Sequence, residues 1–154
     1  MAELTVSDII DIKTIIPHLK VKNKDEALLA MATKLFEADY LKDIKNYLND
    51  VYEREKEGET GIGNYIAIPH GKSESVKRSG VAIATIDEEI EWETLDDKGV
   101  KVIVLFAVGA TTEAAQEHLR LLAMFARKLG RDAVIDALLK ADNANEIKAA
   151  FVDN

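Results

Sequence analysis

The sequence predicts an α/β fold: a single domain with a mixed parallel and antiparallel central sheet flanked by helices. Helical periodicity marks the segments before residue 58 and after residue 112, whereas short β-branched runs fill the part between them. The connections between those middle runs are short and hairpin-like, which favours a mixed sheet over an all-parallel one. A length of 154 residues fits one domain, 1–154, whose core needs no disulfide or structural metal.

Two amphipathic helices are predicted before the strands. Asn23 can cap the first helix, with Glu26 completing a capping-box-like pattern, and apolar residues repeat at helical spacing as far as Phe36. The second helix is expected over about 41–57, where Gly58 ends it. Each helix has one apolar stripe, so each is expected to cover the sheet.

Three short β-branched runs predict strands at 65–68, 81–86 and 102–108. The third run hardly alternates, so we expect it to be buried on both faces of the sheet. Ile90 and Trp92, which lie between glutamates, predict a short half-exposed strand. A weaker candidate is 14–17, which Pro17 restricts to a sheet edge or a strand end.

Helical periodicity returns after Gly109. The segment 113–129 predicts a helix that ends at Gly130, and its apolar face is expected to contain Ala115, Leu119, Leu122, Ala126 and Leu129. Two shorter helices are predicted at 131–140 and 145–151. Helices therefore follow the strands as well as precede them, as a sheet covered by helices requires.

Composition excludes several classes of protein. The net charge of −8, from 20 Lys+Arg against 28 Asp+Glu, argues against nonspecific nucleic-acid binding. The chain has no cysteine, which excludes a disulfide scaffold, a thiol nucleophile and every Cys-containing metal site. Its three histidines show no zinc spacing, so neither a metal nor another cofactor is predicted. Apolar runs fall short of the ~20 residues of a membrane span and residues 1–4 begin no signal peptide, so we expect a soluble cytoplasmic protein without direct membrane insertion.

The strongest functional motif is the segment 61–73, which reads Gly-Ile-Gly-Asn-Tyr-Ile-Ala-Ile-Pro-His-Gly-Lys-Ser. A dinucleotide fingerprint and a Walker A loop would each need a glycine at Ile66, so neither motif is present. What remains is His70, presented at the end of a strand by a Pro-His-Gly turn. Pro69 fixes one backbone angle, and Gly71 permits close approach of another molecule to the imidazole. An ordinary loop histidine is the alternative interpretation.

Two further side chains could join His70. The Arg54 guanidinium can hold a phosphoryl group through two hydrogen bonds, although the charge run 53–57 also fits a solvated helix face. His118 shares the apolar stripe of its predicted helix. It is either a satisfied core residue or a second imidazole that faces the sheet and hydrogen-bonds a phosphoryl oxygen. No role is predicted for His18.

These residues belong to an ordered series of motifs. The series comprises Arg-Glu at 54–55, Thr-Gly-Ile-Gly-Asn at 60–64, Ile-Ala-Ile-Pro-His-Gly-Lys-Ser at 66–73, Ile-Glu-Trp at 90–92, the run at 100–108 and Glu-His-Leu-x-x-Leu-Ala at 117–123. It resembles the enzyme IIA components of the bacterial phosphoenolpyruvate:sugar phosphotransferase system (PTS), fructose/mannitol type. The resemblance covers about 23–147, and a series in this order is hard to obtain by chance.

The resemblance implies a phosphoryl carrier for sugar uptake, most similar to the fructose-type branch. His70 would be phosphorylated on a ring nitrogen by the phosphocarrier HPr, and Arg54 and His118 would flank it and stabilise the phosphoryl group. The acceptor would be a cysteine of an enzyme IIB on another polypeptide, because this chain has no cysteine. The membrane component IIC would be reached through IIB, and no cofactor is implied.

An alternative is a regulatory phosphoprotein of the nitrogen-related branch, which would use the same histidine to signal through protein binding. A non-catalytic binding module is disfavoured because all three site residues are present. Two departures from the resemblance bear on partner fit without removing a reacting group. Tyr65 stands where many relatives have a small residue, often glycine, and Ala110 stands where relatives usually have proline.

Overall fold

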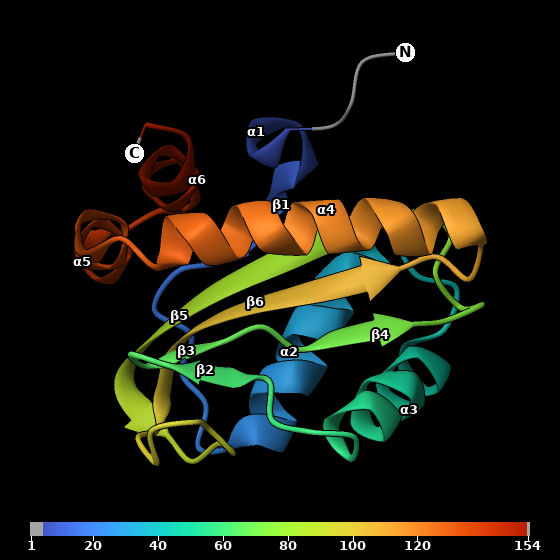
Figure 1. Ribbon diagram of the computed structural model, residues 1–154, viewed down its shortest axis with the longest axis horizontal. Helices are drawn as coiled ribbons and strands as arrows, with labels where there is room; N and C mark the ends of the chain where they lie inside the picture. Colours follow the sequence, from blue (N-terminus) through green and yellow to red (C-terminus); the bar gives the residue numbers. More distant parts are fainter. Residues whose placement is uncertain (1–4, 154) are drawn as a thin grey trace.

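The fold is a six-stranded sheet between two layers of helices, as the computed structural model shows for residues 5–153 (Figure 1). The helices are α1 (Val6–Ile9), α2 (Lys24–Glu37), α3 (Ile44–Glu55), α4 (Thr112–Leu129), α5 (Asp132–Lys140) and α6 (Ala144–Val152). The strands are β1 (Ile10–Ile16), β2 (Gly61–Gly63), β3 (Ile66–Ala67), β4 (His70–Lys72), β5 (Gly80–Ile90) and β6 (Val100–Val108). The predicted α/β class is confirmed, whereas α1 had no predicted counterpart.

The strand order is β1-β5-β6-β3-β2, and β4 also pairs with β6. β5 and β6 are antiparallel, as are β2 and β3, whereas β1 runs parallel to β5 and both β3 and β4 run parallel to β6. The sheet is therefore mixed, as the short connections predicted. β1 lies at its edge, in agreement with the restriction expected from Pro17.

The core occupies both faces of the sheet. α4 crosses one face together with α1, α5 and α6, and α2 and α3 cover the other (Figure 1). Along β6 the side chains alternate between the two cores: Phe106 packs in the cluster that contains Phe125 of α4. Leu105 packs in the cluster that contains Tyr47 of α3. Every residue of β6 except Lys101 is buried, which confirms the expected burial on both faces.

Local capping sets the starts of α2 and α3. The Asn23 side chain accepts the backbone N–H of Glu26, as predicted. The Glu26 carboxylate, however, accepts the N–H of Lys22, so the capping box is not completed. α3 begins later than predicted because the Asp43 side chain caps its first turn.

The strand predicted at 65–68 is shortened to β3, and a second short strand that was not predicted, β4, begins at His70. β3 and β4 flank Pro69, which has no N–H to donate to a ladder, and both strands pair with β6. His70 therefore begins a strand, and the prediction that it ends one is wrong. Ile90 is the last residue of β5 rather than part of a separate strand, and Trp92 is buried rather than half-exposed.

The apolar face of α4 is rotated from the predicted one. Leu119 is 66% exposed and Ala126 is also exposed, so their predicted burial is wrong. The buried residues of this helix are Leu121, Phe125 and Leu129. Two stripes at helical spacing compete in this sequence, and the one with the larger side chains, next to His118, faces the sheet.

The turn between β2 and β3 accommodates the first departure from the family pattern. Asn64 and Tyr65 both have positive φ, 55° and 67°, as a type I′ hairpin turn requires. Glycine is common in such turns because a side chain strains this conformation. The Tyr65 carbonyl accepts the N–H groups of Lys101 and Val102, and these bonds to β6 hold the turn in place. The second departure, Ala110, is exposed just after β6.

α4 is the longest helix, with 18 residues, and it carries charged side chains along its outer face. Among residues 5–153, no helix combines the length and the hydropathy needed to cross a bilayer. The expectation about a signal peptide concerns residues 1–4, which lie outside the described residues.

Candidate functional site

His70 and His118 meet on the α4 side of the sheet. In the parallel pairing of β4 with β6, His70 is in register with Phe106, whose side chain packs beneath α4. Paired residues of neighbouring strands share a face, so the His70 imidazole also points toward α4. The His118 ring contacts Phe106 edge-on, with 5.1 Å between centroids, and its centroid lies 4.8 Å from that of His70.

Gly71 brings α3 close to the opposite face of β4. A Cβ built on Gly71 would lie 2.7 Å from Cγ2 of Val51 and 3.0 Å from Cε1 of Tyr47. Any side chain at this position would therefore push α3 away from the strand. The sequence suggested that Gly71 admits another molecule, but the structure shows that α3 itself occupies this space.

Arg54 lies one helical turn after Val51, and therefore on the side of α3 that faces β4. It is half-buried, whereas Glu53 and Glu57 are exposed, so the charge run is only partly a solvated face. One guanidinium N–H donates to the Gly58 carbonyl at 3.1 Å. The guanidinium is near enough to His70 to lower the pKa of that imidazole.

Both imidazoles favour the neutral state. Burial lowers the pKa of His70, and the Arg54 guanidinium lowers it further. The backbone of Ile68 and the carboxylates of Glu55 and Glu57 oppose this shift to a lesser extent. Burial, assisted by the charge of His70, lowers the pKa of His118 to about 4. At neutral pH each ring therefore has one nitrogen lone pair and one N–H.

Most of the ring nitrogens lack hydrogen-bond partners among the described residues. Nδ1 of His70 and both nitrogens of His118 are buried without a hydrogen bond of ordinary geometry, although the Ile68 backbone lies close enough to the His70 ring to raise its pKa. Buried polar atoms without partners are rare and concentrate where a site has a chemical task. A neutral nucleophile, a neutral hydrogen-bond donor and a guanidinium together suit the binding and transfer of an anionic group.

Two residues that support this site had not been identified from the sequence. Phe106 forms the platform for His118, and the Tyr47 hydroxyl donates to the Phe106 carbonyl at 2.7 Å. Only strand register shows that Phe106 lies beside His70, so no local pattern identifies it. Tyr47 is fully buried, and its position on the apolar stripe of α3 was the one available signal.

The third histidine lies elsewhere. His18 follows β1 and bonds to Asp87 and Asp142 through its two ring nitrogens, at 2.6 and 3.0 Å. Among residues 5–153, no group of three or more His, Asp or Glu side chains is arranged to hold a metal ion.

A mixed sheet with helices on both faces carries two imidazoles in contact, and a guanidinium lies close enough to lower the pKa of one of them. Such a set of groups suits the transfer of an anionic group through histidine. The family model for the "Phosphoenolpyruvate-dependent sugar phosphotransferase system, EIIA 2" matches residues 8–154. The chain belongs to this family of phosphotransferase carriers, which transfer phosphoryl groups through histidine.

Relatives within the family differ in their described roles. The mannitol-specific enzyme IIA component of Halalkalibacterium halodurans is 32% identical over 92% of this chain and 92% of its own length. A fructose-specific EIIA component of Haloferax volcanii is 30% identical over 95% and 97%. A nitrogen regulatory protein of Bradyrhizobium diazoefficiens is 33% identical over 90% and 88%. By contrast, the chain spans only about a fifth (21%) of the 2-O-alpha-mannosyl-D-glycerate-specific EIIABC component of Escherichia coli, with 31% identity over 88% of this chain.

Solved structures share the fold. The nitrogen regulatory protein IIA-Ntr of Neisseria meningitidis superposes with a TM-score of 0.85 and 25% identity, covering 95% of this chain and 98% of that one. Enzyme IIAMTL in its complex with phosphorylated enzyme IIBMTL from Escherichia coli gives 0.78 at 20% identity, over 94% and 98%. At 20% identity, the likeness to enzyme IIAMTL shows a shared fold and nothing more.

Proposed function

We propose that this protein carries phosphoryl groups in sugar uptake, accepting them from phospho-HPr on His70 and passing them to an enzyme IIB. The observation that supports this most directly is the contact between two neutral imidazoles, whose ring centroids are 4.8 Å apart, with the Arg54 guanidinium close enough to lower the pKa of His70. A neutral imidazole is a nucleophile at neutral pH, whereas a protonated one is not.

The proposed transfer uses Nε2 of His70. Because Nδ1 is buried, Nε2 is the nitrogen that an incoming phosphorus atom can reach. The Nε2 lone pair forms a P–N bond as the P–N bond of the donor phosphohistidine breaks, and that electron pair returns to the donor imidazole. Such a loose transition state requires alignment and charge stabilisation more than a strong base. Arg54 supplies positive charge to the phosphoryl oxygens, and His118 supplies a neutral N–H donor.

The acceptor thiol lies outside this sequence, which contains no cysteine. In the second step a cysteine thiolate of enzyme IIB attacks phosphorus, and the P–N electron pair returns to His70. Membership of the enzyme IIA family of the sugar phosphotransferase system supports this choice of partner. The membrane component IIC would then be served through IIB, which implies that the carrier works in the cytoplasm. Similarity to the Haloferax component fits a fructose-type sugar, and similarity to the Halalkalibacterium component fits mannitol equally well, so the proposal extends to a sugar of the fructose/mannitol type.

A second candidate function is nitrogen-related regulation through phosphorylation-dependent protein binding. It is favoured by the 33% identity to the Bradyrhizobium nitrogen regulatory protein and by the TM-score of 0.85 with IIA-Ntr. The two functions differ in their phosphoryl donor. A carrier for sugar uptake reacts faster with the HPr of the sugar branch, whereas a regulator reacts faster with the nitrogen-branch counterpart of HPr.

Removal of His70 tests the proposal. Incubation with phosphoenolpyruvate, enzyme I and HPr should add one phosphoryl group, measured by intact-mass spectrometry at alkaline pH. The bond should be labile in acid and stable in base, because protonation turns the ring nitrogen into a good leaving group. His70→Ala should abolish labelling completely while the protein stays folded.

His18→Ala is the matched control and should be labelled like the wild type, because His18 lies in a different part of the molecule. Persistent labelling of a folded His70→Ala protein would overturn the assignment. Circular dichroism of both variants establishes that they are folded.

A further inference from the structure

The residue that follows Arg54 in α3 has a buried carboxylate. Glu55 is the last residue of α3, and its side chain is only 8% exposed. One carboxylate oxygen is 3.1 Å from Nζ of Lys24, whose side chain is 16% exposed. The other oxygen accepts a hydrogen bond from the Thr60 hydroxyl. Both oxygens are thus engaged with the protein, and Glu55 is not available to bind substrate.

These contacts join α3 to the segment that leads to His70. The Trp92 indole N–H donates to the Thr60 hydroxyl oxygen at 3.4 Å, and the Thr60 carbonyl accepts the N–H of Ile68 at 2.9 Å. Ile68 lies two residues before His70. The Glu55 carboxylate therefore connects the end of the arginine-bearing helix to the backbone that carries the reactive imidazole.

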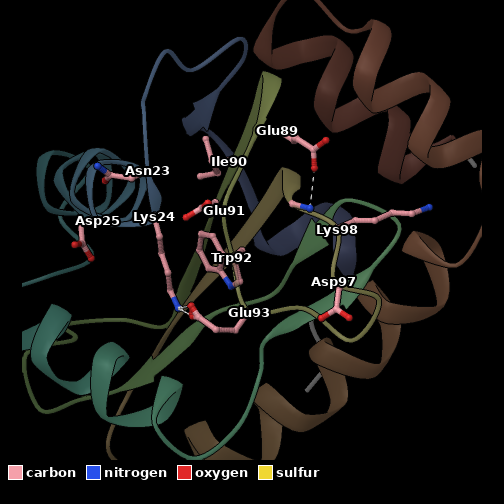
Figure 2. Close-up of a pocket in the computed structure, with 11 residues that line it drawn as sticks. Asn23, Lys24, Asp25, Glu89, Ile90, Glu91, Trp92, Glu93, Asp97 and Lys98 are labelled. Atoms are coloured by element: carbon pink, nitrogen blue, oxygen red, sulfur yellow. Dashed lines mark hydrogen bonds and ion pairs between the residues drawn. The ribbon is translucent and has the colours of Figure 1, made fainter.

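Lys24 is itself fixed in place. It extends from the start of α2 into an open cleft of about 760 Å³, where it points at Glu93 and lies beside Trp92 (Figure 2). Its Nζ is 3.1 Å from the Glu93 carboxylate and 4.8 Å from the centroid of the Trp92 ring. A lysine held by two carboxylates and an aromatic face has little freedom to leave Glu55.

We infer that Glu55 is a positioning residue for phosphoryl transfer, because it anchors the last turn of α3 and so keeps Arg54 beside His70. This inference rests on the proposed function. The ends of helices fray easily, and Arg54 lies in the last turn of α3, where its guanidinium donates a hydrogen bond to the Gly58 carbonyl just beyond the helix. A buried ion pair with a second hydrogen bond opposes this fraying, because breaking it would leave a buried charge unpaired.

Glu55→Gln tests this role because it keeps the shape of the side chain and removes its charge. We expect transfer from phospho-HPr to slow about tenfold, since small displacements of a charge-stabilising group cost up to about a hundredfold. Glu57→Gln is the matched control. Glu57 also raises the pKa of His70, but it is exposed and its charge is screened by solvent, so its substitution should change the rate less than about twofold.

A double-mutant cycle separates positioning from a general loss of stability. If Glu55 acts through Arg54, Glu55→Gln should slow transfer no further in an Arg54→Ala background. Thr60→Val, which removes the other contact, should show the same dependence on Arg54 and serves if Glu55→Gln does not fold. An unchanged rate in folded Glu55→Gln, or an equal loss with and without Arg54, would overturn the inference.

A readout that needs no phosphoryl transfer keeps the two proposals distinguishable. The heteronuclear NOE of the Arg54 Nε–H group should fall in Glu55→Gln and stay unchanged in Glu57→Gln. An unchanged NOE in Glu55→Gln would contradict the anchoring role even if His70 is phosphorylated as proposed. A lowered NOE in a protein that phospho-HPr does not label would instead place the error in the proposed function.

Discussion

His18 and His118 show how differently one fold treats the same side chain. The His18 ring is held between Asp87 and Asp142, and these carboxylates raise its pKa. The His118 ring is buried with no hydrogen-bond partner among the described residues, and its pKa falls to about 4. Carboxylate partners stabilise the imidazolium, whereas burial without them favours the neutral ring. The environment therefore decides whether a histidine acts as a cation or as a neutral donor and nucleophile.

The two regions also differ in what their histidines connect. His18 joins the end of β1 to the end of β5 and to the connection between α5 and α6, through its two carboxylates. Its two hydrogen bonds link these three segments at the protein surface. His70 and His118 contact each other, and most of their ring nitrogens have no hydrogen-bond partner among the described residues. Under the proposed function these nitrogens serve the phosphoryl group. His18 is therefore a structural histidine, whereas His70 and His118 form the pair that we propose to bind and transfer the phosphoryl group.

The largest effects are expected from removing the groups around His70. We expect His118→Ala to slow transfer from phospho-HPr while leaving His70 modifiable. Arg54→Ala should cost at least as much, because it removes a charge rather than a neutral donor. The expected loss for each is ~1.4–3 kcal/mol of transition-state stabilisation, a ten- to hundredfold decrease in rate measured by rapid quench. Wild-type rates in both variants would show that the cluster is only structural.

The pKa values of the three histidines can be measured directly. NMR of the ring carbons and nitrogens should show His118 titrating first from the acid side, at about 4, because its burial opposes protonation. His70 should titrate below its ordinary value of 6.5, and His18 should titrate above it. Asp87→Asn should lower the pKa of His18 without changing that of His118. A His118 that titrates at or above 6.5 would remove the basis for a neutral donor.

The smallest expected effect is the pH dependence of stability. The pKa of His18 is higher in the folded protein than in the unfolded chain. Its ion pairs with Asp87 and Asp142 therefore stabilise the fold fully below pH 6.5, and this stabilisation is lost as the pH rises through the pKa of His18 in the folded protein. His118 has the opposite sign, because the unfolded chain takes up its proton first as pH falls from 6.5 toward about 4.

His18→Gln should therefore reduce the free energy of unfolding in urea below pH 6.5 and leave it nearly unchanged at alkaline pH. A stability difference between wild type and His18→Gln that grows with pH would contradict this sign. Glu88→Gln, which changes an exposed carboxylate next to Asp87, controls for a general loss of surface charge.

Much of the architecture could be predicted from the sequence, because the patterns that mark helices and strands are local. Helical periodicity, the Asn23 cap and the β-branched runs predicted the main helices, the mixed sheet and the doubly buried β6. The motif series around His70 indicated the family that the comparisons establish. These features depend on residues a few positions apart, so chain order is sufficient to identify them.

The way in which His70, His118 and Arg54 come together could be seen only in the tertiary structure. Strand register placed His70 next to Phe106, and the packing of α4 chose which of two stripes faces the sheet. The missing side chain of Gly71 let α3 approach β4 and bring Arg54 with it. Contacts of this kind join residues far apart in the chain, and their energy depends on shape, burial and charge in three dimensions rather than on local pattern. For the same reason the neutral state of His118 and the buried carboxylate of Glu55 could be seen only once the elements were packed together.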